Sequence, residues 1–265
     1  DYELARFDSG LLFFYFSSTD QRQHMFWRLI DKDHPSYDPV LASKYGNAIE
    51  NIYIEMDKIL AKAMEKADKD TVLMVMSDHG FSPFRHCFNL NTWLVENGYH
   101  SPINKWKEGD VGFTNTDWSR TKAYAYGLNG LYINQKGREA EGIVEAGREK
   151  EALVREIAQN LENFKDPKTG ERPVLRAFIA RDVYHGPYVE EAPEIIVGCN
   201  HGFRISSGSA LGRIPREIVE DNKDKWSGDH CMAPEVLPGI LLTNFRIKHE
   251  FPALYDLTPT ILQVF

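Results

Sequence analysis

The chain has 265 residues with 31 basic and 39 acidic side chains, which gives a net charge of -8 at pH 7. This length suits one large α/β domain or two small ones, and a hydrophobic fraction of 42% can supply the core. The acidic balance argues against sequence-independent binding to a nucleic-acid backbone, so no nucleic-acid partner is expected.

The cysteine spacing and the lack of long apolar runs argue against two further classes of protein, those held together by disulfides or thiolate zinc sites and those that span a membrane. The three cysteines lack a C-x-x-C spacing, so neither a disulfide framework nor a thiolate zinc site is indicated. No run of about 18 apolar residues occurs, so no membrane segment is expected. Residue 1 is Asp rather than Met. We therefore expect the chain to be a portion of a longer polypeptide. Any export signal would then lie upstream of Asp1, so the cellular location stays open.

The first predicted elements form a strand–helix–strand unit. Residues 11–17, LLFFYFS, are typical of a strand buried on both faces in a parallel sheet. Apolar residues recur at steps of three and four over 41–64, which predicts one helix, and residues 72–76, VLMVM, predict the second strand. Open sheets bind ligands at the carboxyl ends of their strands, so Asp20 and Asp78 are expected at the same sheet edge.

The middle of the chain predicts a small insert, or cap, over about 100–190 within a single α/β domain spanning 1–265. Residues 104–120 are polar and without clear period, which indicates an excursion over the surface. Residues 124–134 predict two short strands around a Gly-containing turn, and 149–164 carry apolar residues at helical spacing.

The carboxyl-terminal third predicts two strands and a helix. Residues 194–197 and 236–242 are apolar and are expected to extend the main sheet. Pro259 is a helix-start signal, so 260–265 are expected to form a terminal helix packed on that sheet.

Two clusters of Asp and His follow the first two predicted strands, and these residue types are ordinary ligands of zinc and manganese. Asp20 and His24 are four apart, so both would project from one face of a helix, although such an Asp can also simply cap it. Asp78 and His79 precede Gly80, which permits a tight exit from the strand. Their alternative roles are turn capping and hydrogen bonding to backbone.

A third cluster, Asp229-His230, lies in the segment WSGDHCMAP (226–234), with Gly228 for flexibility. Cys231 could ligate zinc, but a single soft donor is more often a packed small residue. A two-metal centre is therefore the first hypothesis, with the ligands Asp20, His24, Asp78, His79 and His230.

Substrate contacts are less defined. His86 and His185 are outside candidates, and Phe81, Tyr126 and Asn129 could stack on a base or bond to a phosphate oxygen. Core packing is at least as strong an expectation for the two aromatic residues, Phe81 and Tyr126.

Three motifs, STDQRQH (18–24), SDHGF (77–81) and SGDHCMAPEVLPGILL (227–242), resemble the alkaline phosphatase superfamily. The resemblance is strongest to its type I phosphodiesterase and nucleotide pyrophosphatase branch. VYHGPYVEEAPEIIVG (183–198) and LYDLTPTIL (254–262) are similar to segments of bacterial members, so the likeness runs across almost the whole chain. It implies an α/β fold, a three-layer sandwich with a mostly parallel central sheet, with amino-terminal elements missing.

The resemblance also implies two divalent metal ions, usually zinc and sometimes manganese. Asp20, His24 and His230 would bind one ion, and Asp78 and His79 the other. In the family the second ion also takes an upstream Asp and the nucleophilic Thr or Ser, and neither has a match here, because the family places both before the first predicted strand. Metal is therefore expected to bind better at the first position.

The implied activity is metal-dependent hydrolysis of a small-molecule phosphate ester, most readily a phosphodiester or a nucleotide pyrophosphate, through a phosphoenzyme. Ser17, Ser18 and Thr19 carry hydroxyls nearby, but their motif position is wrong for the nucleophile, so this chain alone would lack the covalent step. The alternatives are a phosphomonoesterase, phosphomutase or sulfatase of the same superfamily, or a metal-binding fragment without turnover. The identity of the ester and the oligomeric state stay open.

Overall fold

The computed structural model describes residues 2–104 and 112–264. Its α-helices are α1 (Tyr2–Arg6), α2 (Ser18–Phe26), α3 (Pro39–Tyr45), α4 (Ala48–Lys66), α5 (Leu90–Glu96), α6 (Arg148–Asn163), α7 (Ala180–Val183), α8 (Ser207–Ala210) and α9 (Leu254–Leu262). Its strands are β1 (Met74–Met76), β2 (Ser82–Phe88), β3 (Ala123–Tyr126), β4 (Gly130–Ile133), β5 (Val174–Ile179), β6 (Ile195–Cys199), β7 (Gly202–Ile205), β8 (Val219–Asp221), β9 (Gly228–Asp229) and β10 (Leu241–Thr243). Short 3-10 helices span Trp27–Leu29, Val189–Glu191 and Pro234–Val236.

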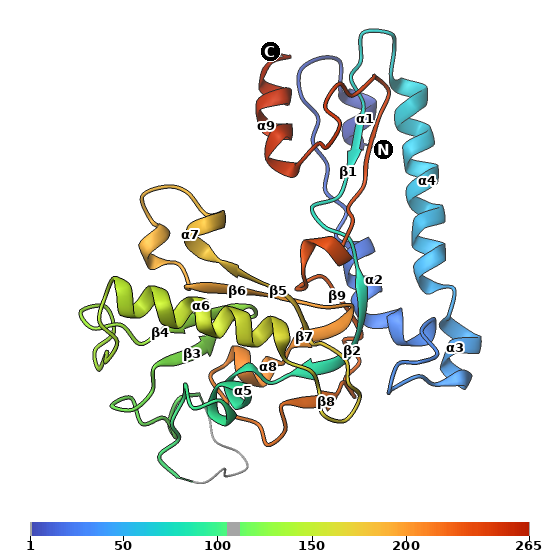
Figure 1. Ribbon diagram of the computed structural model, residues 1–265. Coiled ribbons are helices and arrows are strands. Elements are labelled where there is room, and N and C mark those ends of the chain that lie inside the picture. The colour runs from blue at the N-terminus through green and yellow to red at the C-terminus, as the bar shows by residue number, and fades with distance from the viewer. Residues whose placement is uncertain (1, 105–111, 265) are drawn as a thin grey trace.

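The elements gather into two regions (Figure 1). The larger region contains the sheet β3-β4-β6-β5 and the sheet in which β2 pairs with β7, β8 and β9, together with α5 to α8. The smaller region contains the two-stranded sheet β1-β10 with α1, α4 and α9 around it. Helix α2 and strand β9 lie side by side where the two regions meet, so this junction brings distant parts of the sequence together.

The expected mostly parallel central sheet is not found in residues 2–104 and 112–264, where the sheets are largely antiparallel. Among the described strand pairings only β2 with β7 is parallel. Strand β1 pairs antiparallel with β10, which comes from near the far end of the chain rather than from a neighbouring βαβ unit. Strands β3 and β4 form the predicted hairpin, whose antiparallel register follows from its short turn at Gly127 (φ 75°).

Two amino-terminal predictions are wrong in detail. The apolar run 11–17 is not a strand, and its side chains from Leu11 to Phe16 are exposed. The predicted single helix over 41–64 is two helices, because Asp38 caps α3 by accepting from Val40 N and Leu41 N, and α3 ends at Tyr45 before α4 begins. The predicted surface excursion 104–120 includes residues 105–111, which lie outside the described part of the chain.

The carboxyl-terminal elements also differ from expectation. The strand predicted over 236–242 is reduced to β10, and β6 belongs to a different sheet from β1. Helix α9 begins at Leu254 rather than at Pro259, because the Asp256 carboxylate accepts the Ala253 N–H and holds an earlier first turn. None of the described helices has the length and apolar character needed to cross a membrane.

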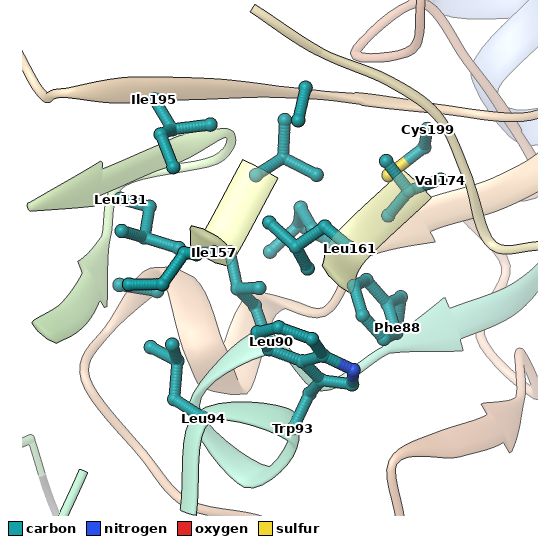
Figure 2. Close-up of a cluster of buried hydrophobic side chains, with 14 of the residues drawn as sticks. Phe88, Leu90, Trp93, Leu94, Leu131, Ile157, Leu161, Val174, Ile195 and Cys199 are labelled. Carbon is teal, nitrogen blue, oxygen red and sulfur yellow. The ribbon is translucent and has the colours of Figure 1, made fainter. Parts of the chain in front are cut away.

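The hydrophobic core lies in the larger region, between α6, α5 and the strands that flank them (Figure 2). Ile157 and Leu161 of α6 are fully buried one turn apart, as the helical spacing predicts, and they face Leu131, Phe88 and Trp93. This core supports β2 and β6, and β2 in turn pairs with β9 beside the histidine cluster described next.

Candidate metal centre

Three segments supply the side chains of the centre. Asp20 and His24 lie one turn apart on α2, His79 lies in the loop that follows β1, and His230 directly follows β9. Helix α2 is fastened to β9 by two hydrogen bonds: the Ser227 N–H donates to the His24 carbonyl at 2.7 Å, and His24 Nδ1 lies 2.6 Å from the Gly228 carbonyl oxygen. The chain therefore fixes the relative positions of residues more than 200 places apart.

One carboxylate oxygen is the focus of the cluster. Oδ1 of Asp20 lies 3.3 Å from Nε2 of His24, 3.6 Å from Nε2 of His230 and 3.9 Å from Nε2 of His79. The donor atoms of Asp20, His24 and His230 all lie within 4.8 Å of one another. The rings of His79 and His230 stack with centroids 3.6 Å apart. Four of the five predicted ligands thus converge.

The hydrogen bonds define which ring nitrogens face the cluster. Nδ1 of His24 lies against the Gly228 carbonyl, and Nδ1 of His79 lies 3.0 Å from the Gly80 carbonyl. A carbonyl oxygen only accepts, so each Nδ1 carries the proton in the neutral ring, and each Nε2 presents a lone pair toward Asp20. An imidazole held at Nδ1 by an oxygen is the usual arrangement of a metal-binding histidine.

Burial favours the neutral imidazoles. It lowers the pKa of His24 below the ordinary value, against the opposing effects of the Gly228 hydrogen bond and the nearby carboxylates. Burial, and after it the neighbouring His79, lowers the pKa of His230. Neutral rings are the form that binds metal.

The cluster fits a divalent cation better than it fits a set of direct hydrogen bonds. Oδ1 of Asp20 is buried and has no hydrogen-bond partner. Neutral rings with Nδ1 protonated place lone pairs opposite a carboxylate oxygen, which is repulsive unless a cation or added protons lie between them. Imidazole and carboxylate are donors that suit zinc and manganese.

Asp78 lies at the rim of the cluster. Its side chain is 57% exposed, and its Oδ2 is 3.5 Å from His79 Nε2. It is not among the three residues whose donor atoms gather within 4.8 Å. The structure therefore places Asp78 and His79 beside the first group, with Asp78 open to solvent.

A second close group, Asp229, His230 and Cys231, fits a metal poorly. Both Asp229 oxygens are occupied: Oδ1 accepts the N–H groups of His230 and Cys231, and Oδ2 accepts from Trp226 Nε1 and lies 2.8 Å from Arg204 Nε. Burial raises the pKa of the Cys231 thiol to about 11, so it is protonated at neutral pH.

The sequence pointed to Asp229 only as the neighbour of His230 in the third cluster, and it did not single out Trp226 or Arg204. Burial opposes ionisation of Asp229, but Arg204 and then the surrounding N–H donors hold its pKa below the ordinary value. Trp226 and Asp229 stand in the same WSGDH segment as His230, which is the one signal that could have indicated them. Arg204, on β7, has no local motif.

Most of the residues predicted as possible substrate contacts either bond within the protein or lie apart from the cluster. The Phe81 ring lies edge-on to His24 with centroids 4.8 Å apart and forms a wall of the cluster. The Asn129 amide donates to the carbonyls of Val197 and Cys231. Tyr126 and His185 are exposed, and His86 pairs with Asp221 at 3.3 Å, a contact that involves none of the clustered residues.

Comparison with known proteins links the chain to a protein family. The family model described as type I phosphodiesterase / nucleotide pyrophosphatase matches residues 3–230, a span that runs from before Asp20 to His230. No curated protein matches the chain.

Proposed function

Since the chain belongs to the type I phosphodiesterase / nucleotide pyrophosphatase family, a family of phosphate-ester hydrolases, we propose that it binds two divalent metal ions for the hydrolysis of a small phosphodiester or nucleotide pyrophosphate. Zinc is the first choice of metal, and manganese is the second. Asp20, His24 and His230 hold one ion in this proposal, and Asp78 and His79 hold the other.

The observation that carries the proposal is the buried Oδ1 of Asp20, which has no hydrogen-bond partner although three imidazole Nε2 atoms lie 3.3 to 3.9 Å away. A divalent cation supplies the charge that such a group of acceptors lacks. A bound ion of this kind polarises a phosphoryl oxygen and neutralises charge that develops during hydrolysis.

The chain's own contribution is to hold the ligands in place and, by burial, to favour the neutral rings of His24 and His230. The Gly228 and Gly80 carbonyls orient His24 and His79 through their Nδ1 atoms. The side chain of Asp78 is 57% exposed at the rim of the cluster, where solvent can reach it. We expect the Asp20, His24, His230 position to bind its ion more tightly, because it has three protein ligands against two.

These residues account for metal binding and not for nucleophilic attack. In the family pattern the attacking Thr or Ser precedes the segment at Leu11, and Thr19 is already engaged, since its hydroxyl donates to the Phe16 carbonyl at 3.1 Å. The proposal therefore assigns no residue of this chain as the nucleophile.

Metal binding is tested first. The purified chain, stripped with a chelator, is titrated with zinc and with manganese while bound metal is measured by equilibrium dialysis. We expect tight zinc binding that falls by at least about 100-fold in affinity in His230→Ala, and wild-type binding in the control His86→Ala. Wild-type protein that binds no divalent metal would overturn the proposal.

The reaction is tested with the full-length protein. We expect zinc-dependent release of nitrophenol from bis(4-nitrophenyl) phosphate, faster than from 4-nitrophenyl phosphate, and loss of this activity in His230→Ala. A preference for the monoester would favour the phosphomonoesterase alternative. Absence of hydrolysis of either ester by metal-loaded protein would contradict the hydrolase assignment.

A further inference from the structure

A buried carboxylate lies directly behind the candidate ligands. Asp229 is 2% exposed, and its two oxygens face four donors: the backbone N–H groups of His230 and Cys231 at 2.8 and 2.9 Å, the Trp226 indole N–H at 2.7 Å, and Arg204 Nε at 2.8 Å. The Arg204 N–H does not point along a hydrogen bond, so this last contact is an ion pair. Oδ1 thus accepts two hydrogen bonds, and Oδ2 accepts one beside the Arg204 guanidinium, so both oxygens are engaged by the protein and Asp229 is poorly placed to act as a ligand.

The contacts of Asp229 lead to two different candidate ligands. Its Oδ1 fixes the backbone at His230 and Cys231, and this fixes the direction in which the His230 side chain leaves the chain. Its Oδ2 holds the Trp226 indole, whose ring stacks on the His24 imidazole with centroids 3.6 Å apart and planes 23° apart. One carboxylate therefore restrains a histidine of α2 and a histidine that follows β9.

The edge of the His24 ring is restrained from the same segment. Nδ1 of His24 contacts the Gly228 carbonyl, and Gly228 directly precedes Asp229. Strand β9 is itself paired with β2, at Ser82 and Pro83. One face and the Nδ1 edge of the imidazole are thus contacted by neighbouring residues of one segment, and Asp229 accepts three hydrogen bonds within that segment.

We propose that the Asp229–Arg204 ion pair is a positioning device for metal binding, which acts by orienting His230 through the backbone and His24 through Trp226. Burial of a carboxylate is costly unless it is fully paired, and here the pairing partners are the groups that set the two imidazoles. This inference rests on the proposed metal centre. It adds Asp229, Arg204 and Trp226 as residues that control metal affinity without touching the ion.

The test compares Asp229→Asn with a matched control, Asp31→Asn. Asp31 is also a buried carboxylate, with its side chain 7% exposed, paired to Arg85 by two contacts of 2.7 Å and accepting a backbone N–H, but none of its partners is a candidate ligand. An Asn cannot satisfy donors on both sides, because one side of its amide carries hydrogens. Both variants therefore lose a buried ion pair, and only one loses the restraint on the histidines.

Zinc affinity and the visible absorption spectrum of the cobalt-substituted protein are measured on folded, chelator-stripped samples. For Asp229→Asn we expect 10- to 100-fold weaker zinc binding, on the order found for groups that orient metal ligands, and a changed cobalt spectrum. For Asp31→Asn we expect lower thermal stability with unchanged affinity and spectrum. Equal zinc affinity in Asp229→Asn and wild type overturns the inference, as does an equal loss in both variants.

A second variant covers the case in which Asp229→Asn does not fold. Trp226 is 41% exposed, so Trp226→Leu removes the ring over His24 and leaves the Asp229–Arg204 pair in place. We expect at least about fivefold weaker zinc binding, and unchanged affinity would contradict the positioning role. Wild-type protein that binds no metal defeats the proposed function itself, whereas wild-type binding with unaffected variants defeats this inference alone.

Discussion

Oδ1 of Asp20 shows how a single atom can be unfavourable for the fold and useful for binding. It is buried, lacks a hydrogen-bond partner and faces the Nε2 atoms of His24 and His79, which carry lone pairs when Nδ1 is protonated. Such an arrangement costs free energy when no cation is present. Strain of this kind is typical of sites whose geometry serves a ligand rather than the fold.

Asp20→Asn tests this view of the carboxylate. The variant removes the negative charge and offers an amide N–H to a facing Nε2, so we expect the metal-free protein to be no less stable than wild type. Zinc affinity should fall by at least about 100-fold. Thermal unfolding in excess chelator and zinc titration measure the two effects. Marked destabilisation of the metal-free variant would show that Asp20 has a structural partner.

His100 provides a pH-dependent contribution to stability. It is 2% exposed, its Nε2 bonds to the Thr116 hydroxyl, and burial lowers its pKa from 6.5 to about 4. Between these values the unfolded chain binds the proton more readily than the folded chain. The neutral ring's contribution to stability is therefore complete above about pH 6.5 and is lost as the pH falls toward 4.

The corresponding prediction concerns His100→Gln. Between pH 7 and pH 4.5 the free energy of unfolding should fall by about 2 kcal/mol more in wild type than in this variant, because the variant lacks the titrating ring. Urea denaturation at the two pH values measures the difference. His201→Gln, at an exposed histidine, should behave as wild type. An identical pH dependence of the free energy of unfolding in all three proteins would refute the lowered pKa of His100.

At the scale of helices and strands, the sequence predicts elements well where one face packs against a core. The helix α6 and the hairpin β3–β4 agree with the spacing of their apolar residues and with the Gly-containing turn. The run 11–17 shows the opposite case. Its composition is that of a buried strand, but a strand needs a partner for its backbone groups, and no described strand pairs with it.

The difference between buried and exposed helical faces gives a matched pair of variants. Ile157 of α6 is fully buried, whereas Ile54 of α4 is 47% exposed. Ile157→Ala should lower the free energy of unfolding by about 2–5 kcal/mol, and Ile54→Ala by no more than about 0.5 kcal/mol. Urea denaturation measures both. Comparable losses would mean that the apolar face of α4 is covered in solution.

On the scale of the whole molecule, the residues of the histidine cluster are predictable from local motifs, and the residues that surround them are not. Asp20, His24, His79 and His230 each stand beside a recognisable motif, and the fold brings them together. Arg204 could not be foreseen, because its role depends on β7 lying near β9 through their shared neighbour β2. The antiparallel pairing of β1 with β10 likewise depends on contacts between distant segments.

The smaller region exposes much apolar surface. The six side chains from Leu11 to Phe16 are 36% to 71% exposed, which is unusual for a contiguous segment of a folded protein. We expect the native chain to enhance the fluorescence of the apolar dye anilinonaphthalene sulfonate. The double variant Phe13→Ser, Phe14→Ser should reduce this signal, and Tyr188→Ser, at an exposed aromatic elsewhere, should not. Dye fluorescence at the level of buffer would contradict this.

The fastening of α2 to β9 has a consequence for biogenesis. The His24 imidazole and the Gly228 carbonyl that holds it are 204 positions apart, and a chain is synthesised from its amino end. The nascent chain therefore contains Asp20 and His24 long before His230, the third candidate ligand of that position, has been translated. In the proposed metal centre the three-ligand position therefore forms only after residue 230 has been synthesised, and an ion bound there would hold α2 against β9 in the folded protein.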